Sequence, residues 1–270
     1  MMPAPASPQS VAAKCQHQFR LFFIALQFFT RLPIPRWVGF SPEWMQHAPR
    51  YFPGVGIVVG AVTAGVYAIA IYLWPQSVAV LLSTAAGIYL TGALHEDGFA
   101  DMCDGFGGGY TPDRVLEIMK DSRIGAYGAI GIGLLIALKC VVLIGMPSWS
   151  VLAVLLLGHP LSRLASAALI WRLSYVKKAG KAKPVAQHMS APEFGIAAAS
   201  VFLPMLVLGL TGWLAWAAIV AGAIAAAAAT LWLARFFFRR IGGYTGDCLG
   251  AVQQVSEVAF YLGVLATLSI

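Results

Sequence analysis

Charged residues are scarce in this chain. Only 11% of the 270 residues are Asp, Glu, Lys or Arg, whereas 59% are hydrophobic. A soluble domain is about one quarter charged, so this composition excludes an ordinary soluble enzyme. The four cysteines include no C-x-x-C pair, which argues against a zinc site or a disulfide framework. The sequence also has no Walker A motif and no GxGxxG followed by an acid, which excludes the nucleotide-binding folds that carry them.

Long apolar runs are present instead. Stretches of about 18 or more apolar residues are typical of membrane spans. We count seven, at residues 54–74, 78–94, 125–146, 149–171, 196–213, 214–234 and 251–270. The second is short, and Gln253, Gln254 and Glu257 interrupt the last. We therefore expect an all-α polytopic protein, with about seven transmembrane helices in a single integral membrane domain over residues 1–270.

The segments between the spans have distinct expected roles. Residues 1–18 are expected to form a disordered tail, and residues 19–53 an arm whose apolar part, 19–30, suits an interfacial helix. Residues 95–124 are expected to form an acidic catalytic loop, and residues 235–250 a second site loop. Thr111 and Pro112 predict the start of a short surface helix inside the acidic loop.

Basic residues set the expected orientation. With seven spans, sixteen of the eighteen Lys and Arg residues, all except Lys139 and Arg163, lie on one side of the membrane. They occupy the N-terminal arm, the acidic loop, the loop after the fourth span and the loop after the sixth. The positive-inside rule makes this side the cytoplasm. The net charge of +7 then reflects orientation and affinity for anionic lipid, and no nucleic acid partner is expected.

The acidic loop is the main candidate site. Seven of the eleven acidic residues lie within residues 96–121. If the second span continues as helix, Asp97, Asp101 and Asp104 share an arc of about 60°, while Glu96 points about 100° away. Carboxylates stacked in this way repel one another unless a cation neutralises them. The pattern predicts a Mg²⁺ site with Asp97, Asp101, Asp104 and, more weakly, Glu96 as ligands. The alternative is a solvated acidic loop, which a position beside a membrane span disfavours.

Neighbouring residues extend the candidate site. Gly107 and Gly108 would let backbone N–H groups approach a phosphate, or would simply form a turn. Asp121 and Arg123 form either an ion pair or a metal ligand beside a phosphate clamp. His95 is a candidate for orienting a neighbour or facing a phosphate.

Ionisable residues inside the spans are functional candidates by default. His159 and Arg163 share a helix face near Pro160, where Arg163 could face a phosphate, whereas Lys139 is expected to snorkel.

A polar stripe follows the start of the last span. Asp247, Gln254 and Glu257 fall on one helix face there, which favours a site over a simple helix cap.

These motifs resemble the cobalamin synthase family, the adenosylcobinamide-GDP ribazoletransferases. The matching residues are His95-Glu-Asp-Gly-Phe-Ala-Asp-Met-Cys-Asp-Gly-Phe-Gly-Gly108, Ile118-Met-Lys-Asp-Ser-Arg-Ile-Gly125, Leu26-Gln-Phe-Phe-Thr-Arg-Leu-Pro-Ile-Pro35, Tyr51-Phe-Pro-Gly-Val-Gly56 and Gly246-Asp-Cys-Leu-Gly-Ala251. The departures, Phe99 and Ala126, remove no charged group.

The resemblance implies a Mg²⁺-dependent enzyme of the inner membrane with a cytoplasmic site. Its substrates would be adenosylcobinamide-GDP and α-ribazole or α-ribazole 5′-phosphate, and GMP would leave. Asp97, Asp101 and Asp104 would hold the metal, Asp121 or Asp247 would accept the hydroxyl proton, and Arg123 and Arg163 would clamp phosphate. Association into a homo-oligomer, the number of metal ions and the lower-ligand base stay open.

Two rival functions fit less well. A CDP-alcohol phosphatidyltransferase would need Asp-Gly-x-x-Ala-Arg, but Phe-Ala-Asp follows Gly98 here. A secondary transporter would need repeat symmetry and acids near the middle of the membrane. Neither feature is found in the sequence.

Overall fold

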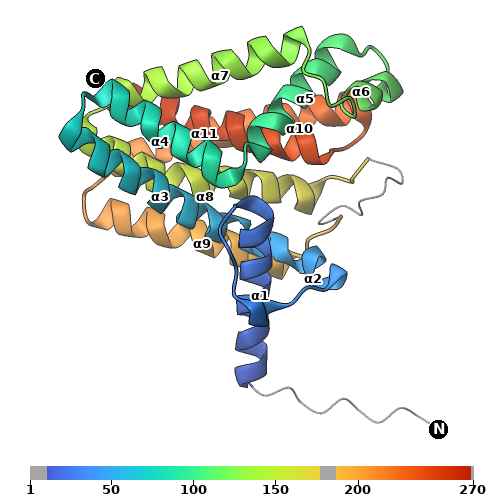
Figure 1. Ribbon diagram of the computed structural model, residues 1–270, viewed down its shortest axis with the longest axis horizontal. Helices are drawn as coiled ribbons and strands as arrows, with labels where there is room; N and C mark the ends of the chain where they lie inside the picture. The colour runs from blue at the N-terminus through green and yellow to red at the C-terminus, as the bar shows by residue number, and fades with distance from the viewer. Residues whose placement is uncertain (1–10, 177–186, 269–270) are drawn as a thin grey trace.

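The protein is a bundle of long helices (Figure 1). The computed structural model describes residues 11–176 and 187–268. These residues form the α-helices α1 (Val11–Phe29), α2 (Pro42–His47), α3 (Phe52–Leu73), α4 (Gln76–Thr91), α5 (Leu94–Gly108), α6 (Pro112–Ile118), α7 (Ala126–Ile144), α8 (Ser148–Arg172), α9 (Ala191–Leu210), α10 (Trp216–Ile241) and α11 (Gly246–Leu268). Within this part of the chain the only β pairing is an isolated bridge between Tyr175 and Tyr244. The expected all-α polytopic fold is confirmed.

The seven predicted spans coincide with α3, α4 and α7 to α11. Six of these helices are long and apolar enough to cross a membrane alone. The exception is α4, which has 16 residues and passes the same test only together with α5, bent from it by 88°.

The bend between α4 and α5 corrects one prediction. The helix of the second span does not continue into the acidic segment, because Gly92 and Ala93 both adopt left-handed backbone, with φ of 65° and 59°. Two such residues in succession end an α-helix. The chain then restarts as α5, so most of the segment predicted as an acidic loop is helical.

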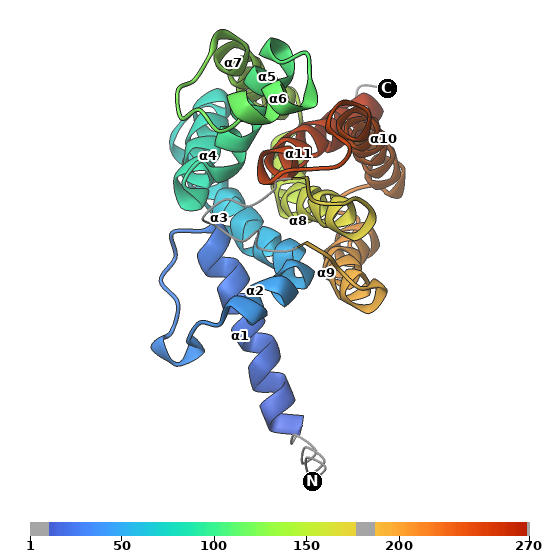
Figure 2. The same ribbon diagram turned by 90° about the vertical axis from the view of Figure 1, so that its right-hand side faces the viewer.

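Two helices form the centre of the bundle. Figure 2 shows α8 and α11 between α3 and α4 on one side and α9 and α10 on the other. The spanning parts of α8 and α11 are 72% and 67% buried, against 17% for α9. Polar side chains in the middle of α8 and α11, such as Arg163, Gln253 and Glu257, are therefore buried inside the bundle.

Helix α1 stands roughly at right angles to the long helices (Figure 1). This orientation is expected of a helix lying in the membrane interface. The helix begins at Val11, so residues 11–18 of the expected disordered tail are helical. Gln18 accepts a hydrogen bond from the Tyr51 hydroxyl at 2.8 Å, and His17 packs edge-on against Trp44, which holds these turns against the arm. Residues 1–10 lie outside the described part of the chain.

The two predicted site loops meet at one end of the bundle. There α5 and α6 lie near the end of α10 and the start of α11 (Figure 1). Thr111 caps α6 as predicted, by accepting a hydrogen bond from the Arg114 backbone. Arg240 at the end of α10 donates to the Gly109 carbonyl at 2.6 Å, so it closes the last turn of α5. Residues 177–186, which carry four lysines of the loop after the fourth span, lie outside the described residues.

Glycines allow α10 and α11 to pack closely. A Cβ atom added at Gly263 would lie 2.7 Å from the Ala221 carbonyl oxygen and 2.7 Å from the Gly222 Cα atom. Both obstacles are backbone atoms, which cannot rotate away.

We therefore expect Gly263→Ala to destabilise the protein by about 1–3 kcal/mol, the usual cost of overpacking. The measurement is the melting temperature of the purified protein in detergent. Gly133→Ala is the matched control, because an added Cβ there meets nothing within 4 Å. Equal melting temperatures for the two variants would contradict this packing.

Candidate active site

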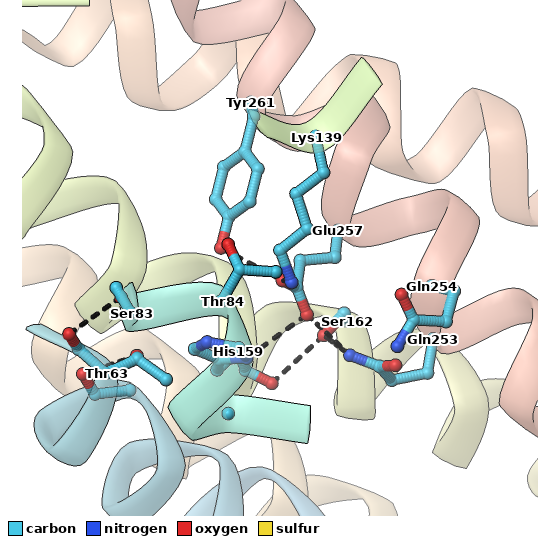
Figure 3. A network of polar contacts seen from close by, with 12 residues as sticks. Thr63, Ser83, Thr84, Lys139, His159, Ser162, Gln253, Gln254, Glu257 and Tyr261 are labelled. Carbon is cyan, nitrogen blue, oxygen red and sulfur yellow. Dashed lines mark hydrogen bonds and ion pairs between the residues drawn. The ribbon is translucent and has the colours of Figure 1, made fainter. Parts of the chain in front are cut away.

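A fully buried carboxylate organises the polar interior of the bundle. Glu257 on α11 is 0% exposed and forms an ion pair with Lys139 Nζ on α7. Its Oε2 atom lies 3.1 Å from His159 Nδ1 on α8. Figure 3 shows the three side chains converging from their separate helices. Because charges buried in a membrane domain are costly unless paired, this contact draws α7, α8 and α11 together.

Hydrogen bonds complete the environment of Glu257. Gln253 Nε2 donates to Oε2 at 2.6 Å and to Ser162 Oγ at 3.1 Å, and Tyr261 donates to Oε1 at 3.1 Å. The carboxylate is thus held by several donors, which a buried charge requires. The expectation that Lys139 snorkels is wrong, since its amine is buried in this pair.

A small cavity opens beside this network. Its lining comes from α3, α4, α5, α7, α8 and α11, and includes His95, Glu96, His159, Arg163 and Gln254. Its volume is about 20 Å³. That is room for one or two water molecules and too little for a phosphate group.

Arg163 and His95 lie in the wall of the cavity rather than at the surface. Arg163 is 2% exposed, and its Nη1 donates to the His159 carbonyl at 3.1 Å. His95 is buried and stacks on Phe29 with ring centroids 5.3 Å apart. In this arrangement neither side chain is open to a phosphate that approaches from the end of the bundle.

The four acids of the predicted metal site have different surroundings. Asp97 is exposed and Asp101 is half-buried on α5. Asp104 accepts hydrogen bonds from the backbone of Gly125 at 2.7 Å and Gly128 at 2.8 Å, and thereby caps the start of α7.

Glu96 turns away from the other acids. Its Oε1 accepts a hydrogen bond from Gln254 at 2.9 Å, on the cavity side of α5. Among the described residues, no three His, Cys, Asp or Glu side chains are gathered as a ready-made metal site.

Asp247 is brought against α5. A Cβ atom added at Gly98 would lie 3.1 Å from the Asp247 Cα atom, and one at Gly250 would lie 3.1 Å from the His95 carbonyl oxygen. This close approach depends on glycine in both helices. It sets the start of α11 beside the turn that carries Asp97 and Asp101, so the predicted candidates from the two loops are neighbours.

The predicted phosphate-binding glycines are helical. Gly107 and Gly108 belong to the last turn of α5, where their N–H groups bond within the helix. Their lack of a side chain instead makes room for neighbours: a Cβ atom at Gly107 would meet the Tyr127 ring, and one at Gly108 would lie 3.3 Å from Ile118. The expected loop is therefore wrong, since both glycines lie in a helix, and their contact with a phosphate stays a prediction.

Asp121 and Arg123 pair with each other. Arg123 Nε lies 3.0 Å from Asp121 Oδ1 and Nη2 lies 2.7 Å from Oδ2, both at the exposed surface. The hydrogen bonds from Arg123 lower the pKa of Asp121 to about 2. Of the two alternatives that the sequence left open, the structure shows the ion pair.

Some residues of the polar interior were not predicted as site residues. Gln253, Ser162 and Tyr261 bond the network, and Lys139 was expected to snorkel. The only sequence signal for Gln253 was that it interrupts an apolar span. Ser162 and Tyr261 are common in membrane helices and gave no signal.

Comparison with known proteins identifies the family. A family model described as cobalamin-5-phosphate synthase matches residues 21–265, which is nearly the whole chain. The chain belongs to the cobalamin-5-phosphate synthase family.

Relatives in this family are similar over their whole length. One from Leptothrix cholodnii is 46% identical over 267 residues, which cover 93% of this chain and 96% of the relative. One from Shewanella frigidimarina is 43% identical over 94% of this chain and 97% of the relative. One from Ralstonia pickettii is 44% identical over 94% and 98%. All three are named adenosylcobinamide-GDP ribazoletransferase. No solved structure matches this chain significantly.

Removing one partner of the buried ion pair should be more harmful than neutralising both. Lys139→Met leaves the Glu257 carboxylate without its cation and is expected to destabilise the protein by about 3–5 kcal/mol. Adding Glu257→Gln removes the stranded charge while an amide still bonds Gln253 and Tyr261, so the double variant should be more stable than Lys139→Met alone. Melting temperatures in detergent test this order, and the reverse order would contradict the pairing.

Proposed function

We propose that this chain transfers α-ribazole, or α-ribazole 5′-phosphate, onto adenosylcobinamide-GDP with release of GMP. A ribose hydroxyl oxygen attacks the phosphorus next to the aminopropanol linker, and the bond from that phosphorus to the GMP oxygen breaks. The hydroxyl proton passes to a carboxylate. The products are adenosylcobalamin, or its 5′-phosphate, and GMP.

One observation carries this proposal. The acidic helix α5 presents Asp97 and Asp101 beside Asp247 at one end of a membrane bundle. The chain that carries this helix matches relatives of this named activity over nearly its whole length. Phosphoryl transfer requires neutralisation of phosphate charge and a proton acceptor, and little covalent chemistry from the protein. Clustered carboxylates at this end would hold a divalent cation that neutralises the phosphates, and one of them would accept the proton.

Mg²⁺ is proposed to bind together with the substrate. Mg²⁺ sites commonly use one or two carboxylates plus substrate phosphates rather than a complete protein cage. Asp97 and Asp101 are the proposed ligands, because Asp97 is exposed and Asp101 is partly exposed one turn later on the same helix. Asp104 caps α7 and Glu96 bonds Gln254. When bound, the ion would neutralise charge on the pyrophosphate and the leaving GMP.

Asp247 is the proposed proton acceptor. It adjoins α5 through Gly98, and Thr245 donates to its Oδ2 at 3.3 Å. Asp121 is the weaker candidate, because its bond to Arg123 lowers its pKa to about 2 and makes it a poor base.

The site is proposed to face the cytoplasm from the inner membrane. Sixteen of the eighteen Lys and Arg residues are predicted to lie on this side of the membrane, including Arg114, Arg123 and Arg240. The positive-inside rule places that end in the cytoplasm.

Loss of a proposed metal ligand should abolish turnover. Asp97→Asn and Asp101→Asn are each expected to lower the rate of GMP release by about 100-fold or more, as loss of a positioned electrostatic group does. The assay supplies adenosylcobinamide-GDP, α-ribazole and Mg²⁺ to the purified protein in nanodiscs, and chelation should stop GMP release until Mg²⁺ is restored.

Asp113→Asn is the matched control for these two variants, because Asp113 is exposed in the first turn of α6. It should retain the wild-type rate. GMP release that is absent from the folded wild-type protein, or unaffected by both substitutions, would overturn the proposal.

The two candidate bases can be separated directly. Asp247→Asn is expected to lower kcat by about 100-fold, within the range assigned to general-base catalysis. Asp121→Asn should change kcat by less than about threefold, since its partner is a surface arginine. The same GMP assay distinguishes them, and a larger loss for Asp121→Asn would reverse the assignment.

A further inference from the structure

Unpaired polar atoms converge on the cavity between the helices. Within the described residues, Arg163 Nε, His159 Nε2, Gln253 Oε1 and Glu96 Oε2 are buried without a hydrogen-bond partner, and all four side chains line the cavity. Arg163, His159 and Gln253 are only 2%, 4% and 1% exposed. Buried polar atoms are rarely left unsatisfied, so such a group of them indicates a ligand.

The orientation of Gln253 follows from its neighbours. Its Nε2 must face the Glu257 carboxylate, because an amide oxygen there would be repelled. The Oε1 atom is consequently directed away from Glu257, and no group in the described residues donates to it. The Oε1 atom of Gln253 therefore lacks a donor because of how the side chains pack around Glu257.

Arg163 interacts with two carboxylates but, in the described part of the chain, forms a direct salt bridge to neither. It interacts electrostatically with Glu257 and with Glu96. Among the described residues, however, neither acid approaches the guanidinium within 4.0 Å. An intervening molecule is the usual bridge for charged groups at such a separation.

The unpaired atoms define the chemistry of that molecule. Arg163 Nε needs an acceptor, whereas Gln253 Oε1 and Glu96 Oε2 need donors. A cation would leave the arginine unmatched, and an anion would leave both oxygens unmatched. Water satisfies both kinds of group, and the cavity volume of about 20 Å³ suits one or two molecules.

We propose that this cavity is an internal water site in which one or two waters bridge Arg163 Nε to Glu96 Oε2. The bridge ties the acidic helix α5 to the central helix α8, beside the direct bond from Gln254 to Glu96. Because Asp97 follows Glu96 on α5, Arg163 acts as a positioning residue for the metal-binding turn. This second step rests on the proposed function, whereas the water site itself does not.

Radiolytic labelling tests the water site without any turnover. Brief X-ray exposure makes hydroxyl radicals from bound water, so a side chain beside internal water is oxidised although bulk solvent cannot reach it. His159 should be labelled. The Phe260 and Phe237 rings react faster with hydroxyl radicals, but both are 0% exposed and neither lines the cavity, so they should be protected. Labelling of His159 that is no greater than that of these two rings would overturn the proposal.

A double-mutant cycle tests the bridge. Glu96→Gln and Arg163→Gln should each lower kcat for GMP release by about 10-fold, with KM changed by less than about twofold. The double variant should lose about 10-fold as well, because groups joined by one bridge give non-additive effects. A 100-fold loss in the double variant would refute the bridge, and a raised KM for Arg163→Gln would indicate direct contact with substrate instead.

Two features keep this test decisive. Glu96→Gln is nearly isosteric, so it provides a folded variant even if Arg163→Gln unfolds. The labelling of His159 can then still be measured in the Glu96→Gln variant. Arg172→Gln, at the exposed end of the same helix, is the charge-matched control and should retain wild-type kinetics. If wild-type protein releases no GMP but His159 is labelled, the proposed function fails and the water site stands.

Discussion

The pairing of Glu257 with Lys139 is the constraint on which the rest of the bundle depends. An ionised carboxylate in the interior of a membrane domain is tolerated only when charge and hydrogen bonds surround it. Glu257 obtains them from α7, α8 and its own helix, and no single helix could supply them all. The rotation of these helices about their axes is therefore set by the need to satisfy one buried charge.

This interior network extends to the acidic helix. Gln254 follows Gln253 in the sequence and donates a hydrogen bond to Glu96 on α5. Gly98 and Gly250 let α5 and α11 approach closely. The left-handed backbone at Ala93 turns α5 away from α4 so that this contact can form. Polar packing in the core thus fixes where the acidic face lies at the end of the bundle.

The acids at that end of the bundle have different surroundings. Asp104 caps α7, Glu96 accepts a hydrogen bond from Gln254 on α11, and Asp121 forms an ion pair with Arg123. Asp97 is exposed and Asp101 is half-buried on α5, near Asp247. Acids that lie close together in the sequence consequently have different surroundings in the fold.

The sequence by itself determined the membrane spans, the short helix capped by Thr111 and the family. Apolar length is set by bilayer thickness, capping is local, and family motifs are linear, so each can be read along the chain. Only the tertiary structure decided that Lys139 pairs with Glu257, that Gly107 packs in a helix and that α5 breaks from α4 at Ala93, an alanine that favours helix. These outcomes depend on which helix faces meet. The spacing of residues within one helix does not show which distant helix it will contact.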